Sequence, residues 1–203
     1  MDHTIKPKTK GSAQLFKNPV LERLSRTHIS IPLSLYTVIS VGLLYYGVSE
    51  IGLSGLAVVA LFITGFLTFT LFEYLAHRYV FHMEHTNELK AKIQYTVHGV
   101  HHEFPKDKDR LAMPPLLALV YVAVFFFVFR LLLGEGVFAF VPGMLTGYSL
   151  YLFVHYAVHA YQPPKNFLKI LWVHHAIHHY KDPERAYGVS SPLWDYVFGT
   201  MPK

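Results

Sequence analysis

Four long apolar stretches dominate this 203-residue sequence and restrict what it can fold into. They span residues 31–48, 51–72, 116–133 and 137–154, and each approaches the roughly 20 residues that a helix needs to cross a bilayer core. Hydrophobic residues form 52% of the chain and charged residues 15%, which excludes a disordered chain and an ordinary soluble domain. We therefore expect an all-α integral membrane protein with four transmembrane helices.

Very short connections join these stretches in two pairs. Ser49 and Glu50 separate the first two, and residues 134–136 separate the last two, so each pair is expected to form a helical hairpin. Both turns must then lie on one side of the membrane, opposite the N-terminus, the central segment and the C-terminus. Arg130 and Pro142 weaken the second hairpin, and in an alternative with fewer full crossings this hairpin is partly re-entrant.

Lysine and arginine indicate which side of the membrane is cytoplasmic. Of the 18 such residues, six precede residue 27, six lie within residues 78–110 and five follow residue 164, so only Arg130 stands apart. The positive-inside rule therefore predicts that the tail, the centre and the C-terminal region are cytoplasmic. The same rule accounts for the net charge of +5, and no nucleic-acid partner is expected. We expect residues 1–30 to form a loosely held cytoplasmic tail and residues 31–203 a single domain.

Histidine is the second unusual feature, because its 14 copies outnumber the 13 acidic residues. Ten histidines form four clusters with the spacings H-x4-H, H-x2-HH, H-x3-H and H-x2-HH. In chain order these are His77 and His82; His98, His101 and His102; His155 and His159; and His175, His178 and His179. Helix positions i, i+3 and i+4 share a face, so the last three clusters should each point into one small volume. Positions i and i+5 lie about 140° apart on a regular helix, so a helix end or bulge is expected near residues 79–80.

The four clusters fall at the predicted cytoplasmic ends of the spans or in the segments that follow, so they can meet beneath the bilayer. Ten neutral nitrogen donors suit two five- or six-coordinate ions, and iron, zinc and copper are all compatible. The chain has no cysteine, which removes thiolate ligands and iron–sulfur clusters. An all-histidine metal pair is better suited to activating dioxygen beside an apolar substrate than to hydrolysis. His85 and His174 are weaker candidates, and His174 is expected to support the ligands or lie at the surface.

Around these histidines the sequence resembles the membrane fatty acid hydroxylases of the sterol desaturase superfamily, most closely the fatty acid 2-hydroxylases. The resemblance covers residues 73–200. It rests on the stretches EYLAHRYVFH, HGVHHEFPKDKDRLAMPP, GYSLYLFVHYAVH, HHAIHHY and YGVSSPLWDYVFGT.

The resemblance implies a helical membrane enzyme with a cytosolic cap over a dimetal centre. Such an enzyme uses O2 and two electrons to hydroxylate C2 of a fatty acid or an N-acyl, sphingolipid-type lipid. The ten clustered histidines would be the ligands, with iron as the working metal and zinc as an alternative in purified protein. No bound haem or flavin is expected. Tyr148, Tyr151 and Asp195 match family positions near the site and are expected to supply hydrogen bonds that orient the imidazoles.

Two departures from the family pattern qualify this expectation. Leu152 stands where members often carry aspartate, so a proton relay through that carboxylate is not implied for this chain. The tail is also too short for the cytochrome b5 domain that many eukaryotic members carry. A separate ferredoxin, cytochrome b5-like protein or reductase is therefore expected to donate electrons. The expected location is a bacterial inner membrane, or the endoplasmic reticulum if the source is eukaryotic.

Two other functions fit part of the pattern. A carotenoid or sterol hydroxylase or desaturase of the same superfamily would use the same metals on a different apolar substrate. The H-x4-H spacing and the stretches RLAMPP and LWDYVFGT resemble the acyl hydroxylases more closely. A non-catalytic membrane metal-binding or transport protein would carry histidines along a path through the bilayer, whereas none falls in the middle of a predicted span.

Overall fold

The computed structural model describes residues 5–84 and 86–203, and every regular element within these ranges is a helix. This confirms the predicted all-α class. The α-helices are α1 (Pro19–Leu24), α2 (Ser30–Ser49), α3 (Gly55–Ala76), α4 (Glu88–Gln94), α5 (Val100–Glu103), α6 (Pro115–Leu133), α7 (Val137–Ala160), α8 (Lys169–Tyr180) and α9 (Leu193–Val197). Two π-helices, η1 (His77–Phe81) and η2 (Tyr95–Gly99), and two 3-10 turns, η3 (Lys108–Arg110) and η4 (Gly134–Gly136), complete the set.

Three helical stretches are long and apolar enough to cross a membrane. They are Ser30–Ser49, Gly55–Phe81 and Lys108–Ala160, and the third contains both α6 and α7 with the turn η4 between them. Many large apolar side chains on these helices are exposed, including Leu56, Leu131 and Val38. Such surfaces are stable in contact with lipid and not with water, so the protein is a membrane protein.

The bounds of two helices differ from those that hydropathy predicts. α3 begins at Gly55 and not at residue 51, because Gly52 takes a left-handed φ of 77° and the Ser54 hydroxyl caps the helix by accepting the Ala57 N–H. α7 continues past residue 154 to Ala160. Hydropathy detects where apolar residues stop, whereas the backbone hydrogen bonds of α7 continue through its histidines.

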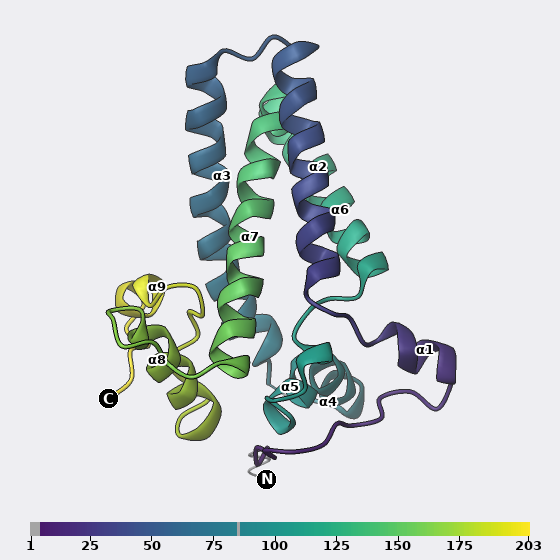
Figure 1. Ribbon diagram of the computed structural model, residues 1–203, viewed down its shortest axis with the longest axis vertical. Coiled ribbons are helices and arrows are strands. Elements are labelled where there is room, and N and C mark those ends of the chain that lie inside the picture. Colours follow the sequence, from purple (N-terminus) through teal and green to yellow (C-terminus); the bar gives the residue numbers. More distant parts are fainter. Residues whose placement is uncertain (1–4, 85) are drawn as a thin grey trace.

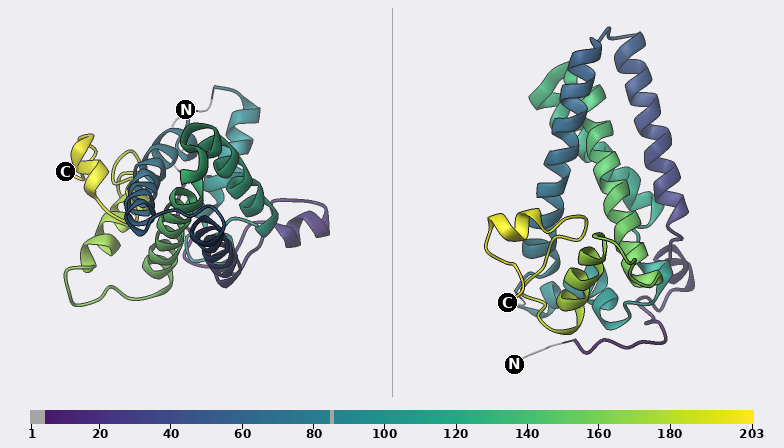
Figure 2. Two further views of the ribbon diagram at one scale, coloured as in Figure 1. Left: turned by 90° about the horizontal axis from the view of Figure 1, so that it is seen from above. Right: turned by 60° about the vertical axis from the view of Figure 1, so that its left-hand side comes forward.

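The two hairpin turns lie at one end of the molecule, as Figure 1 shows for the α2–α3 connection and for the turn between α6 and α7. The short helices α1, α4, α5, α8 and α9 lie at the opposite end, as does the C-terminus, and the right-hand view in Figure 2 agrees. The short helices and the histidine-bearing segments are thereby gathered at one end of an apolar bundle.

Helix α7 forms the centre of the bundle and lies between α2 and α3 (Figure 1). It approaches α3 closely through two glycines. A Cβ atom at Gly143 would lie 2.0 Å from the Phe62 carbonyl oxygen, and one at Gly65 would lie 2.0 Å from that of Phe140. Small residues let membrane helices pack backbone against backbone, and here they fix α3 and α7, which both lead into the histidine clusters.

The N-terminal segment is attached to the rest of the chain, in contrast to the loosely held tail that we expect from its polar composition. Arg110, whose side chain is only 3% exposed, donates to Glu22 at 2.5 Å. The Thr27 N–H also donates to the carbonyl of Asp109 at 2.7 Å. Polar groups of the segment 5–29 therefore bond residues in and beside η3. Hydropathy does not predict these contacts.

Candidate dimetal centre

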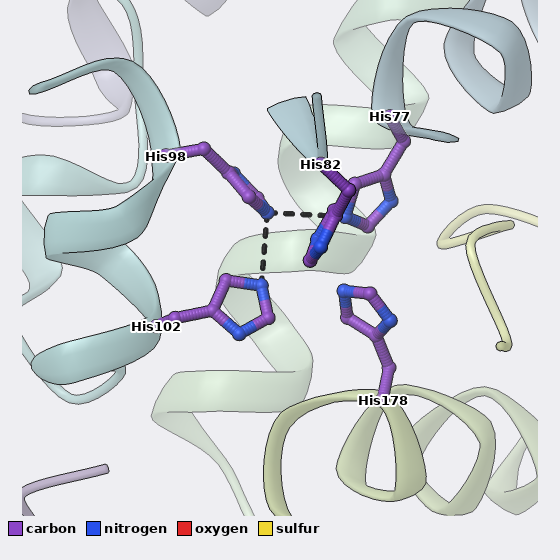
Figure 3. A group of neighbouring side chains, drawn as sticks. All are labelled: His77, His82, His98, His102 and His178. Carbon is purple, nitrogen blue, oxygen red and sulfur yellow. Dashed lines mark hydrogen bonds between the residues drawn. The ribbon is translucent and has the colours of Figure 1, made fainter. Parts of the chain in front are cut away.

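Ten histidines converge where α3 and α7 meet the short helices. They form two groups of five, and within each group one ring nitrogen from every histidine lies within 4.8 Å of the others. Group one, drawn in Figure 3, comprises His77, His82, His98, His102 and His178. Group two comprises His101, His155, His159, His175 and His179. The structure thus brings together all ten residues of the four predicted clusters.

The two HH dipeptides divide their rings between the groups. His102 and His178 belong to group one, while their neighbours His101 and His179 belong to group two. Successive residues on a helix point about 100° apart, so one dipeptide can serve two adjacent sites. This differs from our expectation that each H-x2-HH cluster fills a single volume. Within each H-x2-HH cluster, only the two histidines four residues apart stay in the same group, and the HH dipeptides join the two groups.

A π-helix aligns the two histidines of the first cluster. The His82 N–H donates to the carbonyl of His77 at 3.2 Å, which is the i→i+5 bond that defines this helix type. The wider turn returns residues five apart to one face, and the two ring centroids lie 5.2 Å apart. The expected departure from a regular helix near residues 79–80 is confirmed, and it takes the form of η1.

Two carbonyl groups fix the orientation of rings in group one. The Nδ1 atoms of His77 and His178 lie 2.5 Å and 2.8 Å from the carbonyl oxygens of Tyr187 and Arg185. A carbonyl only accepts, so both Nδ1 atoms carry the proton and both Nε2 atoms present a lone pair. The Nε2 atom of His98 lies 3.1 Å from that of His77 and 3.0 Å from that of His102 (Figure 3). The Nε2 lone pair of His77 therefore points toward the ring nitrogens at the centre of group one.

Group two has a similar inner geometry. The Nε2 atom of His101 lies 2.9 Å from that of His155 and 3.1 Å from that of His179, and the corresponding His159–His175 distance is 2.8 Å. All five rings are buried. The group therefore concentrates nitrogen atoms in a volume from which water is largely excluded.

The residues of both groups fit a metal ion. Neighbouring nitrogen ligands at right angles, with metal–nitrogen bonds of about 2.1 Å, lie about 3.0 Å apart, close to the distances between Nε2 atoms seen here. The buried Nε2 atoms of His82 and His178 have no hydrogen-bond partner within the described residues. An unpaired buried nitrogen costs free energy unless something binds it, and a cation at the centre of each group would do so.

Burial keeps these imidazoles neutral. It lowers the pKa of His82 to about 3 and holds the pKa values of His98 and His102 well below the ordinary value, with adjacent imidazoles adding to the effect. The same causes lower the pKa values of His175 and His179. Neutral imidazole is the form that binds metal, so both groups are available to metal at neutral pH.

Glu73 was not among the candidates from sequence, yet it holds the loop that contacts group one. Its carboxylate, buried at the end of α3, accepts the N–H groups of Val189 and Ser190 at 2.8 Å and 2.9 Å and also bonds the Ser190 hydroxyl. The loop carries Tyr187, whose carbonyl bonds His77. A carboxylate four residues before His77, at the end of an apolar stretch, is the sequence signal that could have identified this role.

Asp195 holds the same loop from the other side. Its fully buried carboxylate accepts the N–H groups of Tyr187 and Gly188 at 2.9 Å and 2.7 Å, the Thr200 hydroxyl at 2.7 Å, and lies 2.9 Å from Nε2 of His174. Burial alone would raise the pKa of Asp195, but these donors outweigh burial and lower it. Asp195 thus orients group one through the loop backbone and does not touch a ring of either group in the described structure.

The other candidates occupy different surroundings. Tyr151 stacks on His155 with ring centroids 5.4 Å apart, whereas Tyr148 packs against Tyr36 and Phe69. Within the described residues neither hydroxyl bonds an imidazole, so an orienting role for the two tyrosines stays a prediction. His174 belongs to neither group and pairs with Asp195. His85 lies outside the described residues.

Asp195→Asn is expected to destabilise the protein by about 3 kcal/mol, because one amide oxygen cannot replace a carboxylate that accepts four donors. The melting temperature in detergent should fall, and so should zinc retained per chain. Asp182→Asn is the control, since the Asp182 carboxylate is partly exposed and, within the described residues, bonds only Arg185 and the neighbouring Glu184 N–H. Equal melting temperatures for the two variants would contradict the role assigned to Asp195.

The fold and the two histidine groups define a helical membrane protein with a candidate dimetal centre. The sequence matches the family model "Fatty acid hydroxylase" over residues 62–200, a range that contains all ten histidines. The chain therefore belongs to the fatty acid hydroxylase family.

Two relatives and one solved structure illustrate the similarity. The chain is 40% identical over 147 residues to the fatty acid 2-hydroxylase of Rattus norvegicus, covering 70% of this chain and 40% of the relative. It is 39% identical over 196 residues to the ceramide very long chain fatty acid hydroxylase scs7 of Schizosaccharomyces pombe, covering 94% and 55%. A structure of full-length scs7p, with only the hydroxylase domain visible, matches with a TM-score of 0.87 and 33% identity, covering 96% of this chain and 74% of that one. The chain spans about half the length of these curated relatives.

Proposed function

We propose that this protein is a membrane-bound, non-haem dimetal oxygenase that hydroxylates C2 of a lipid acyl chain. The observation that carries the proposal is the pair of buried, five-histidine groups in a chain of the fatty acid hydroxylase family. The names of its relatives, which include fatty acid 2-hydroxylases and dihydroceramide fatty acyl 2-hydroxylases, support C2 of a free fatty acid or of an N-acyl, sphingolipid-type lipid as the target.

Groups one and two would each hold one ion, with iron as the working metal. The chemistry that a bound iron pair supplies is reductive activation of dioxygen. In the overall reaction one oxygen atom enters the C–H bond at C2, and the other leaves as water after taking up two electrons and two protons. No haem or flavin is needed for this balance.

The chain's own residues prepare the site for this reaction. The carbonyls of Tyr187 and Arg185 hold two protons on Nδ1, so that the Nε2 lone pairs of His77 and His178 stay directed inward. Apolar helices α3 and α7 lead from the bundle to the histidines, which supports delivery of an acyl chain from the lipid. Leu152 is buried among apolar residues of the core, so at this position the chain has no group that moves a proton.

The topology that we propose has four crossings, formed by α2, α3, α6 and α7, with the histidine groups beneath a cytosolic cap of short helices. Residues 31–203 would form one hydroxylase domain, preceded by a cytoplasmic segment. The one-sided distribution of lysine and arginine supports this orientation, in a bacterial inner membrane or the endoplasmic reticulum. A separate ferredoxin, cytochrome b5-like protein or reductase would donate the electrons, and exposed Lys90 and Lys92 on α4 offer basic contacts for an acidic donor.

Lipid mass spectrometry of cells with and without the gene, grown under 18O2, tests the function. We expect acyl chains that gain one labelled oxygen at C2 and no gain with His102→Ala, which removes a histidine of group one. Unchanged acyl chains together with hydroxylated carotenoids or sterols would assign a different substrate. Unchanged lipids of every class, from a chain that retains metal, would favour a non-catalytic metal-binding protein.

A further inference from the structure

The two histidine groups differ in how their rings are held. In group one, backbone carbonyls bond the Nδ1 atoms of His77 and His178. In group two, the buried Nδ1 atoms of His101, His175 and His179 have no hydrogen-bond partner within the described residues. Outer hydrogen bonds of this kind fix ring orientation and raise ligand basicity, and losing one typically weakens metal affinity about 10- to 100-fold. The protein therefore supports a metal in group one better than in group two.

The two groups also differ in access. A pocket of about 270 Å³ between the end of α7 and helix α8 is walled by three histidines of group two, His159, His175 and His179. Its rim includes Ala176 and Tyr180, which are exposed. No histidine of group one lines this pocket. His82 of group one is partly exposed, but its Nε2 atom is buried.

A positive charge also lies beside group two. Lys106 lines the pocket and donates to the carbonyl of His159 at 2.8 Å. The positive charge of this ammonium group would repel a cation in group two. On the side of group one, the carboxylates of Glu73 and Asp195 instead hold the backbone of the loop that contacts His77. The local charges thus favour a cation in group one over one in group two.

We propose that the two metal sites are unequal and that the α7–α8 pocket is the exchange route for the second. The metal of group one binds first and leaves slowly, whereas the metal of group two binds last and leaves first through the pocket. This inference rests on the proposed dimetal function, but it concerns binding and exchange and makes no use of catalytic turnover.

A chelator chase of the zinc-loaded full chain in lipid nanodiscs tests the proposal. Release is followed with a chromogenic chelator and bound zinc by elemental analysis. We expect two phases of equal amplitude whose rates differ by about 10-fold or more. His159→Ala should remove the fast phase and leave one slowly released zinc, whereas His178→Ala should remove the slow phase.

Two further variants test the route. Ala176→Trp places a large side chain at the rim and should slow only the fast phase, while Trp172→Ala widens the pocket and should accelerate it. Ile170→Trp is the matched control, because Ile170 is exposed on α8 but does not line the pocket, and it should change neither phase. Retention of two zinc ions per chain shows that each of these three variants is folded.

Several results would overturn the proposal. A single release phase, a fast phase that survives His159→Ala, or a fast phase unaffected by both pocket variants would each do so. The proposed hydroxylase function would be refuted by a different result. Two unequal phases from a chain that never hydroxylates lipid would refute the function and leave the metal inequality intact, whereas a chain that retains no zinc would refute both.

Discussion

Replacing His101 with alanine is expected to lower lipid hydroxylation by at least about 100-fold and to remove one of the two metal ions. His101 lies at the centre of group two, with its Nε2 atom within 3.1 Å of the Nε2 atoms of both His155 and His179. Removing a ligand costs more than removing a residue that orients one, for which losses of about 10- to 100-fold are typical. Alanine also leaves a gap among the buried rings of group two.

The measurement combines metal content after anaerobic purification with C2 hydroxylation of acyl chains. Wild-type protein should retain close to two irons per chain and His101→Ala close to one. His28→Ala is the control, because His28 is exposed, bonds only Ser30 and its neighbouring backbone, and belongs to neither group. Full activity with a single metal, in wild type or variant, would contradict the dinuclear assignment.

Gly143→Leu is expected to destabilise the bundle by about 3 kcal/mol or more, enough to reduce strongly the yield of folded protein. A Cβ atom at this position would lie 2.0 Å from the Phe62 carbonyl oxygen and 2.8 Å from its carbon, so α3 and α7 must move apart. Helix α3 continues into His77, and α7 carries His155 and His159. Separating the helices therefore disturbs groups one and two together.

Size-exclusion chromatography and thermal melting in detergent measure this effect. Gly42→Leu serves as the matched control, since a Cβ atom at Gly42 in α2 meets no other atom within 4 Å. The control adds the same side chain to a membrane helix without crowding a neighbour. Similar melting temperatures for the two variants would show that α3 and α7 do not pack as closely as described.

Much of the fold follows from local sequence. The apolar stretches predict α2 and α6 to within one residue at each end, because lipid-facing helices begin and end near the limits of hydropathy. The start of α3 is less predictable, since it depends on the turn at Gly52 and the Ser54 cap. The repeated histidine spacings also identify all ten histidines that converge: three pairs at i and i+4 share a helix face, and His77 and His82 share one through the π-helix η1.

Long-range contacts account for what sequence reasoning does not supply. The bond from His77 to the Tyr187 carbonyl joins residues 110 positions apart, and that from Glu73 to the Val189 N–H joins residues 116 apart. No periodicity in either segment indicates its partner. The division of the HH dipeptides between two groups likewise depends on how α5 and α8 face each other, which is a tertiary property.

The π-helix η1 has a consequence for changes in chain length. Deleting one residue between His77 and His82, such as Val80, would convert their separation to four residues, and an ordinary α-helix would then align both rings. Conversely, inserting one residue into an H-x3-H pair gives an H-x4-H pair, and a single π-helical turn keeps both histidines on the same face. A sequence with H-x4-H and one with H-x3-H can therefore differ by the gain or loss of a single codon. Neither sequence needs to pass through an intermediate that lacks the metal site.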